Sequence, residues 1–185
     1  MNTTIVARWQ DWSGDGIQHL VLNMRPDRIV AEGVVLATAE GSRFAAIYRI
    51  ECDVMWQVRV THARMVGVDR RIDLTGDGGG HWRDGSGASM SHLDGAVDVD
   101  LSVTPFTNTL AIRRLDLAQG HTADIRAVYV RLPDLSVTID PQRYTCLKRG
   151  RLYRYESLDS DFVRDVEIDA DGLVVTYPGL FRRVS

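Results

Sequence analysis

Alternation of apolar and polar residues along most of the chain is the feature that most restricts its fold. In "VMWQVRVTHAR", residues 54–64, the apolar side chains of Val54, Trp56, Val58 and Val60 fall at every second position. The segment "AVDVDLSV", residues 96–103, follows the same rule. A period of two is typical of β-strands that cover a core with one face. The sequence therefore predicts a chain made mostly of β-structure.

Strands predicted in this way occur from one end of the chain to the other. They are 5–9, 17–24, 29–38, 43–51, 54–64, 71–75, 97–103, 111–117, 124–132, 136–139, 144–147, 152–157, 164–169 and 173–177. The glycine-containing turns "TGDGGGHW", "KRGR" and "DADG" lie between these segments, as hairpins require. Helical spacing is absent except for a short turn at 104–110 or 157–162.

So many short strands must close on themselves or stack to hide their edges. We expect an all-β fold, a single antiparallel curled β-barrel over residues 1–185 with at most short helical turns. The 185 residues are 44% hydrophobic, which is enough for a core in one domain. "AEGVVLAT" and "RAVYVRL" are apolar on both faces, which fits either an ordinary covered strand or a strand that lines an apolar lumen.

Charge and targeting signals restrict the partners. The net charge is −3 and the paired arginines are scattered, so a nucleic-acid partner is not favoured. The N-terminal residues lack an export signal and no stretch is long enough to span a membrane, so we expect a cytoplasmic protein without stable membrane insertion. In that compartment Cys52 and Cys146 should be free and buried. No metal or cofactor motif is found, and the sequence leaves the oligomeric state open.

The segment "TPFTNTLAIRRL", residues 104–115, places two adjacent arginines after a threonine-rich turn. If 110–117 is a strand, Arg113 and Arg114 lie on opposite faces, and Arg113 needs a carboxylate or an anionic ligand among its apolar neighbours. Asp98 and Asp100 share one face of the preceding strand. We expect "DVDL" and "AIRRL" to be neighbouring strands, with one aspartate paired to one arginine.

The same residues also permit a site. Paired carboxylates suit acid–base chemistry or a hard cation, although pairing with arginine is the simpler interpretation. The short polar side chains of Thr107 and Asn108 either hydrogen-bond the local backbone or contact a sugar. The glycine-rich "GDGGG" is a hairpin tip, since no Lys-Ser/Thr and no helix follow it.

The block "LDGAVDVDLSVTPFTNTLAIRRLDL" resembles the signature of the putative glycolipid-binding family of bacteria. The segments "YRIECDVMWQVRV", "LTGDGGGHW", "QRYTCLKRGRLYRYESLDSDF" and "DADGLVVTYPGLFRRV" resemble the other blocks of that family, in order, over nearly the whole chain. Ala96 and Ala111 depart from the pattern, which more often has Cys and Pro there. The resemblance implies a curled β-barrel similar to carriers of lipids or lipoproteins, and it supplies no catalytic residues.

The leading hypothesis is therefore non-enzymatic binding of an amphipathic small molecule, such as a glycolipid, in an apolar barrel cavity. The alternatives are a cytoplasmic enzyme that acts on a small sugar or acid through an Asp/Arg cluster (Asp98, Asp100, Arg113 and Arg114), and a structural or interaction module. The candidate ligand-binding residues are Asp98, Asp100, Thr107, Asn108, Arg113, Trp56, Tyr48, Tyr129, Tyr153 and Tyr155.

Overall fold

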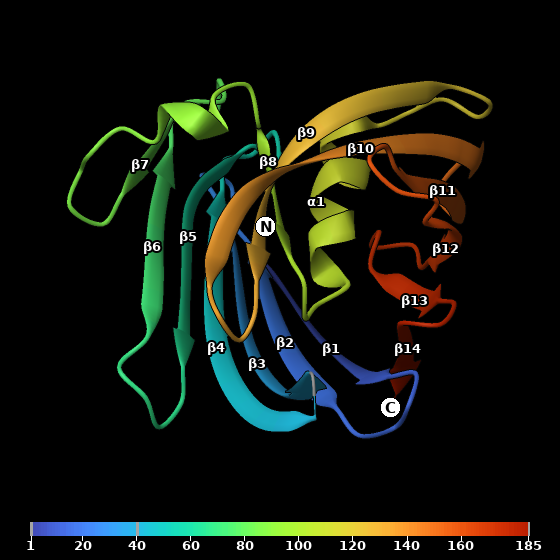
Figure 1. Cartoon of the computed structure of the whole chain (residues 1–185). Coiled ribbons are helices and arrows are strands. Elements are labelled where there is room, and N and C mark those ends of the chain that lie inside the picture. The colour runs from blue at the N-terminus through green and yellow to red at the C-terminus, as the bar shows by residue number, and fades with distance from the viewer. Residues whose placement is uncertain (1, 40, 185) are drawn as a thin grey trace.

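The computed structural model describes residues 2–39 and 41–184, in which one curled sheet of 14 strands surrounds a single α-helix (Figure 1). The strands are β1 (Thr3–Asp11), β2 (Ile17–Met24), β3 (Ile29–Ala39), β4 (Ser42–Cys52), β5 (Val58–Met65), β6 (Arg71–Gly76), β7 (Trp82–Asp84), β8 (Asp98–Leu101), β9 (Thr122–Arg131), β10 (Ser136–Lys148), β11 (Leu152–Ser157), β12 (Val163–Ile168), β13 (Val174–Tyr177) and β14 (Phe181–Val184). The helix is α1 (Phe106–Leu115), and a 3-10 turn covers Ser91–Leu93.

The strand order is β7-β6-β5-β4-β3-β2-β1-β14-β13-β12-β11-β10-β9-β8. Neighbours pair antiparallel except β8 and β9, which are parallel. The predicted all-β class and curled sheet are confirmed, with 57% of the chain in strands. The sheet remains unclosed, because β7 and β8 are its two edges.

Helix α1 replaces the strand predicted at 111–117, and this prediction was wrong. Every residue from Phe106 to Ile112 is buried, so this part of the helix has no solvent-exposed face. A helical period of polar and apolar residues appears in a sequence when one face of the helix is exposed and the other is buried, so it is not seen here. For the same reason "DVDL" and "AIRRL" are not neighbouring strands. The chain instead turns back at Pro105 and lays the helix against β8.

The two aspartates of β8 hold α1 in place. Arg114 donates from Nε to Asp98 Oδ1 at 2.8 Å and from Nη2 to Asp98 Oδ2. Near the other end of the helix, the hydroxyl of Thr107 donates to Asp100 Oδ1 at 2.7 Å. The predicted pairing of an aspartate with an arginine is therefore present, although the arginine comes from a helix. Asp98 is only 1% exposed, so this is a buried ion pair.

Packing on both sides of α1 fills the hollow of the sheet with side chains. Phe106 and Leu110 belong to the larger core, which strands β1 to β9 supply. Ala111 and Ile112 belong to a second core, rich in tyrosine, which strands β10 to β13 supply. The interior that could have been an open lumen is thus occupied by the helix.

The strand predicted from residue 54 begins only at Val58, and residues 54–57 form a loop. Trp56 has φ of +64° and is buried, whereas Val54 is exposed, so the two do not share a strand face as expected. Both cysteines are free and buried, as predicted. Within the described ranges, no helix is long and apolar enough to cross a membrane.

The buried pair generates a stability prediction. Arg114→Met should lower the free energy of unfolding by about 3–5 kcal/mol, because it leaves the Asp98 carboxylate buried without its partner. Asp98→Asn should cost less, since Arg114 keeps partial contact with water, and the double variant should cost less than the two single variants together. Urea denaturation measures all three.

The matched control is Arg149→Met, which removes the exposed pair between Arg149 and Asp116. Such a pair contributes about 1 kcal/mol or less. If Arg114→Met were as mild as this control, the pair would not be what holds the helix.

Candidate functional site

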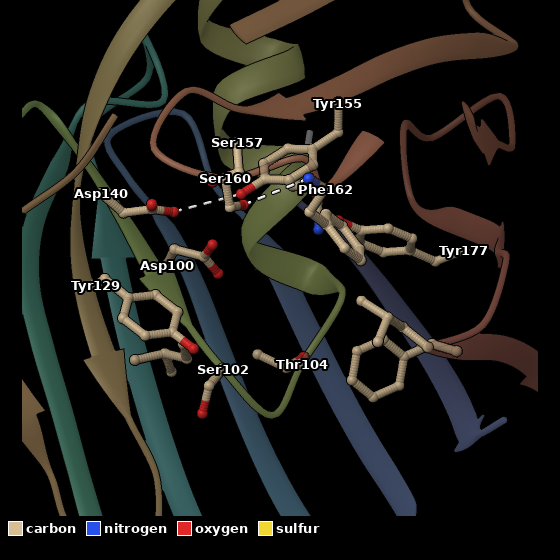
Figure 2. A pocket seen from close by; sticks show the side chains of 14 residues that line it. Asp100, Ser102, Thr104, Tyr129, Asp140, Tyr155, Ser157, Ser160, Phe162 and Tyr177 are labelled. Atoms are coloured by element: carbon tan, nitrogen blue, oxygen red, sulfur yellow. Dashed lines mark hydrogen bonds between the residues drawn. The ribbon is translucent and has the colours of Figure 1, made fainter. Parts of the chain in front are cut away.

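A cavity of about 270 Å³ lies beside the N-terminal half of α1 (Figure 2). It is bounded by the end of β8, the start of α1, strands β9 to β11 and β13, and the loops that follow β11 and β13. Its lining residues are Asp100, Leu101, Ser102, Thr104, Asn108, Tyr129, Asp140, Tyr155, Ser157, Ser160, Phe162, Tyr177, Leu180 and Phe181. We call it the acidic cavity.

Two carboxylates meet in the acidic cavity through one amide. Gln142 Nε2 donates to Asp100 Oδ2 at 2.9 Å and to Asp140 Oδ2 at 2.7 Å. Gln142 itself is buried, so the amide fixes both carboxylates from behind. The pKa of Asp100 is raised to about 6, mainly because the carboxyl is buried; the hydrogen bonds from Thr107 and Gln142 lower this pKa and the Asp140 carboxylate raises it. Burial also raises the pKa of Asp140 above its usual value.

Aromatic side chains form the opposite wall. In Figure 2 the rings of Phe162 and Tyr177 face the carboxylates across the cavity. The ring of Tyr155 lies 5.9 Å from that of Phe162 and 6.2 Å from that of Tyr177, both in edge-to-face geometry. The Tyr155 hydroxyl donates to Asp140 Oδ2 at 3.3 Å, so one tyrosine joins the aromatic wall to the acidic one.

A second hollow, of about 360 Å³, adjoins the acidic cavity and shares Ser102, Tyr129, Leu180 and Phe181 with it. Most of its other lining is apolar. It includes Trp12, Ala37, Phe44 and Leu132. The Trp12 side chain is 48% exposed, which leaves an aromatic surface open to solvent. We call this hollow the apolar groove.

The structure brings some of the predicted site residues together and separates the others. Those that line the acidic cavity are Asp100, Asn108, Tyr129 and Tyr155. Thr107 lies behind it, with its hydroxyl committed to Asp100 and to the carbonyl of Thr104. These positions agree with a site near the threonine-rich turn, and contact with a ligand stays a prediction for each of them.

The remaining predicted residues lie elsewhere. Trp56, Arg113 and Tyr153 border a separate cavity at the other end of α1. Asp98 is closed off by Arg114, and Tyr48 lies in the core. Tyr48 hydrogen-bonds Thr104 at 3.2 Å, and its ring covers Gly33 on the paired strand, where a Cβ would clash. Arg113 is exposed, and its neighbours in that separate cavity include the apolar side chains of Trp56 and Ile112.

Sequence reasoning missed most of the residues that line the acidic cavity. The missed residues that matter most are Asp140, Gln142, Ser157, Ser160, Phe162 and Tyr177. Asp140 and Gln142 are two residues apart on β10, so their side chains share a face with buried Tyr144. Ser136 and Thr138 on the same face are also polar, so this pair does not stand out in the sequence. The loop residues carry no pattern either.

The chemistry of the acidic cavity is that of hydrogen bonding to hydroxyl groups. Carboxylate oxygens accept, the serine hydroxyls donate and accept, and the aromatic rings offer apolar faces. Across the part of the chain that the structure describes, no three His, Cys, Asp or Glu side chains are grouped to hold a metal ion.

The raised pKa of Asp100 generates a pH prediction. A carboxyl whose pKa is higher in the folded than in the unfolded protein binds its proton more tightly when folded, so folding is favoured as the pH falls. Between about pH 7 and about pH 5, the wild type should gain about 1 kcal/mol of stability relative to Asp100→Asn. Urea denaturation at both pH values provides the measurement.

Asp124→Asn serves as the control, because Arg143 lowers the pKa of the Asp124 carboxyl and that group stays ionised throughout this range. Its stability relative to the wild type should not change with pH. Parallel pH curves for the wild type and Asp100→Asn would contradict the raised pKa.

Comparisons with known proteins agree on the family. The family model described as "Putative glycolipid-binding" matches residues 6–183. The crystal structure of a DUF1089 family protein from Pseudomonas aeruginosa is similar, with a TM-score of 0.79 and 37% sequence identity over 90% of this chain and 92% of that one. No curated protein matches the chain. The chain therefore belongs to the family described as putative glycolipid-binding.

Proposed function

We propose that the protein binds an amphipathic glycolipid-like molecule without transforming it. The polar headgroup occupies the acidic cavity and an alkyl portion extends into the apolar groove. The observation that carries the proposal is that the two hollows adjoin and share Ser102, Tyr129, Leu180 and Phe181 in their linings. A ligand that is polar at one end and apolar at the other matches this arrangement.

The carboxylates of the acidic cavity favour a headgroup with several hydroxyl groups. Neighbouring hydroxyls of a sugar ring present donors that the carboxylates of Asp100 and Asp140 accept. Both carboxylates are already oriented by Gln142, so little rotational freedom is lost when the sugar binds. An anionic headgroup would instead be repelled by the two carboxylates.

The apolar groove favours a short alkyl chain that lies along the protein surface. Helix α1 fills the interior of the sheet, so the chain has no lumen to enter. The apolar groove offers Phe44, Leu132 and the exposed indole of Trp12. Burying apolar area against these side chains yields roughly 25 cal/mol per Å².

A second candidate function is catalysis on a sugar, and one specific observation favours it. Two carboxylates with raised pKa values face the same cavity, as acid–base chemistry requires. This pair differs from the Asp/Arg cluster expected from the sequence, because Asp98 and Arg114 neutralise each other and Arg113 lies at the other end of the helix. Release of free sugar from an octyl glycoside would favour the enzyme over the carrier.

We further propose that the protein is a single domain and that it resides in the bacterial cytoplasm. Limited proteolysis tests the first point and cell fractionation tests the second, both independently of the ligand.

Binding of octyl glucoside, below its micelle-forming concentration, tests the main proposal. We expect the Trp12 indole N–H resonance to shift in a saturable way, and octyl glucoside to bind more tightly than glucose or octanol alone. Asp140→Asn should weaken the affinity by about tenfold, because it removes a charge-assisted hydrogen bond. Two-dimensional ¹H–¹⁵N NMR follows the resonance.

The control is Asp124→Asn, which removes an exposed carboxylate paired with Arg143 away from the cavity. Its affinity should equal that of the wild type. Equal affinities for octyl glucoside and octanol, or an unchanged affinity in Asp140→Asn, would exclude a headgroup site at the carboxylates.

A further inference from the structure

A cavity of about 420 Å³ lies at the C-terminal end of α1. Four segments enclose it: the loop before β5, the end of α1, the turn between β10 and β11, and the turn between β12 and β13. The apolar part of its lining includes Met55, Trp56, Ile112, Tyr153 and Ile168. The Met55 side chain is 68% exposed, so an apolar rim faces solvent. We call it the arginine cavity.

Charges in the arginine cavity are paired with one exception. Arg114 is neutralised by Asp98, and Arg149 donates from Nη2 to Asp116 Oδ1 at 2.9 Å. Asp169 is engaged by Arg183 at 3.2 Å. No carboxylate of the described residues forms an ion pair with Arg113. The cavity therefore presents one uncompensated positive charge.

The Arg113 side chain is nevertheless held in place. Its guanidinium carbon lies 5.2 Å from the centre of the Trp56 ring, a cation–π contact. On another side it packs on Gly172, where an added Cβ would lie 2.9 Å from Arg113 Cδ. An arginine fixed by packing, without a carboxylate partner, is prepared to accept an anion.

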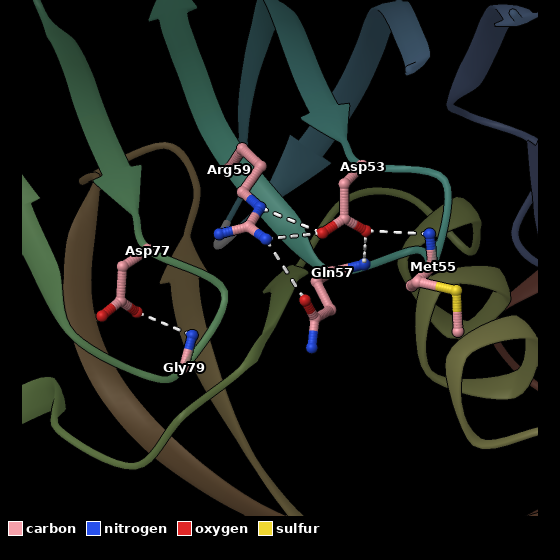
Figure 3. Close-up of polar contacts among 6 residues, drawn as sticks. All are labelled: Asp53, Met55, Gln57, Arg59, Asp77 and Gly79. Atoms are coloured by element: carbon pink, nitrogen blue, oxygen red, sulfur yellow. Dashed lines mark hydrogen bonds and ion pairs between the residues drawn. The ribbon is translucent and has the colours of Figure 1, made fainter. Parts of the chain in front are cut away.

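The loop that carries Trp56 is itself rigidly built (Figure 3). The Asp53 carboxylate accepts hydrogen bonds from the backbone N–H groups of Met55 and Gln57 and from Arg59 Nε and Nη2. The Arg59 guanidinium in turn packs on Gly78 of the "GDGGG" hairpin, at a position where a Cβ would clash. These contacts hold Trp56 at its φ of +64°, an unfavourable value for a non-glycine residue.

We propose that the arginine cavity is a second binding site, which takes an amphipathic anion. The carboxylate, or an equivalent anionic group, pairs with the guanidinium of Arg113 on the side not covered by Trp56. The apolar part lies against Ile112, Tyr153 and Ile168 and reaches the rim at Met55. The site is independent of the acidic cavity, which lies at the other end of α1 and would repel such a ligand.

Octanoate and its neutral counterpart octanamide test the proposal on ¹⁵N-labelled full-length protein. We expect octanoate to shift the Trp56 indole N–H resonance in a saturable way and octanamide to bind more weakly by about tenfold. Arg113→Gln should weaken octanoate binding by a similar factor. The Trp12 resonance reports on the apolar groove in the same spectra, so the two proposals succeed or fail separately.

Arg154→Gln is the control, because it removes a guanidinium that is paired with Asp165 and does not line the arginine cavity. Its affinity for octanoate should stay close to that of the wild type. An unmoved Trp56 resonance, equal binding of octanoate and octanamide, or full affinity in Arg113→Gln would each overturn the proposal.

Discussion

The contact between α1 and the carboxylate face of β8 determines how the interior is used. Asp98 and Asp100 alternate with Val99 and Leu101, so β8 turns its charges towards the helix and its apolar side chains towards the larger core. Arg114 donates hydrogen bonds to the Asp98 carboxylate, and Thr107 donates one to the Asp100 carboxylate. A helix placed anywhere else would leave Asp98 buried without its arginine, which is a large free-energy cost, and would leave Asp100 with the amide of Gln142 alone. The position of α1 therefore follows from four residues.

The cavities at the two ends of the helix carry charges of opposite sign. The cavity near the start of α1 contains two carboxylates bridged by Gln142. The cavity near its end contains an arginine without an acidic partner among the described residues. The two ends can thus select ligands of different charge, although one helix borders both. The apolar groove joins only the acidic end.

The sequence predicted the fold class because alternation persists wherever a strand has one covered face. It failed over 111–117, because the helix is buried on all sides up to Ile112 and shows no periodic pattern there; the short helical turn expected at 104–110 matches only the first part of α1. It failed again at Trp56. The loop conformation there depends on hydrogen bonds from the backbone N–H groups of Met55 and Gln57 to the Asp53 carboxylate, and such bonds leave no periodic pattern in the sequence. Asp100 was within reach of sequence reasoning. Its partner Asp140 was not, since pairing across 40 positions of chain depends on the register of β8, β9 and β10.

The strand order has a consequence for synthesis of the chain. The first strand, β1, lies in the middle of the sheet, between β2 and the last strand, β14. While the chain is being made, β1 presents an unpaired edge that only the final segment covers. Such an edge is a template for wrong pairing with other chains. The half from β1 to β7 must therefore wait for nearly the whole chain before its open side is sealed, and folding is expected to be slow because this contact spans so much sequence.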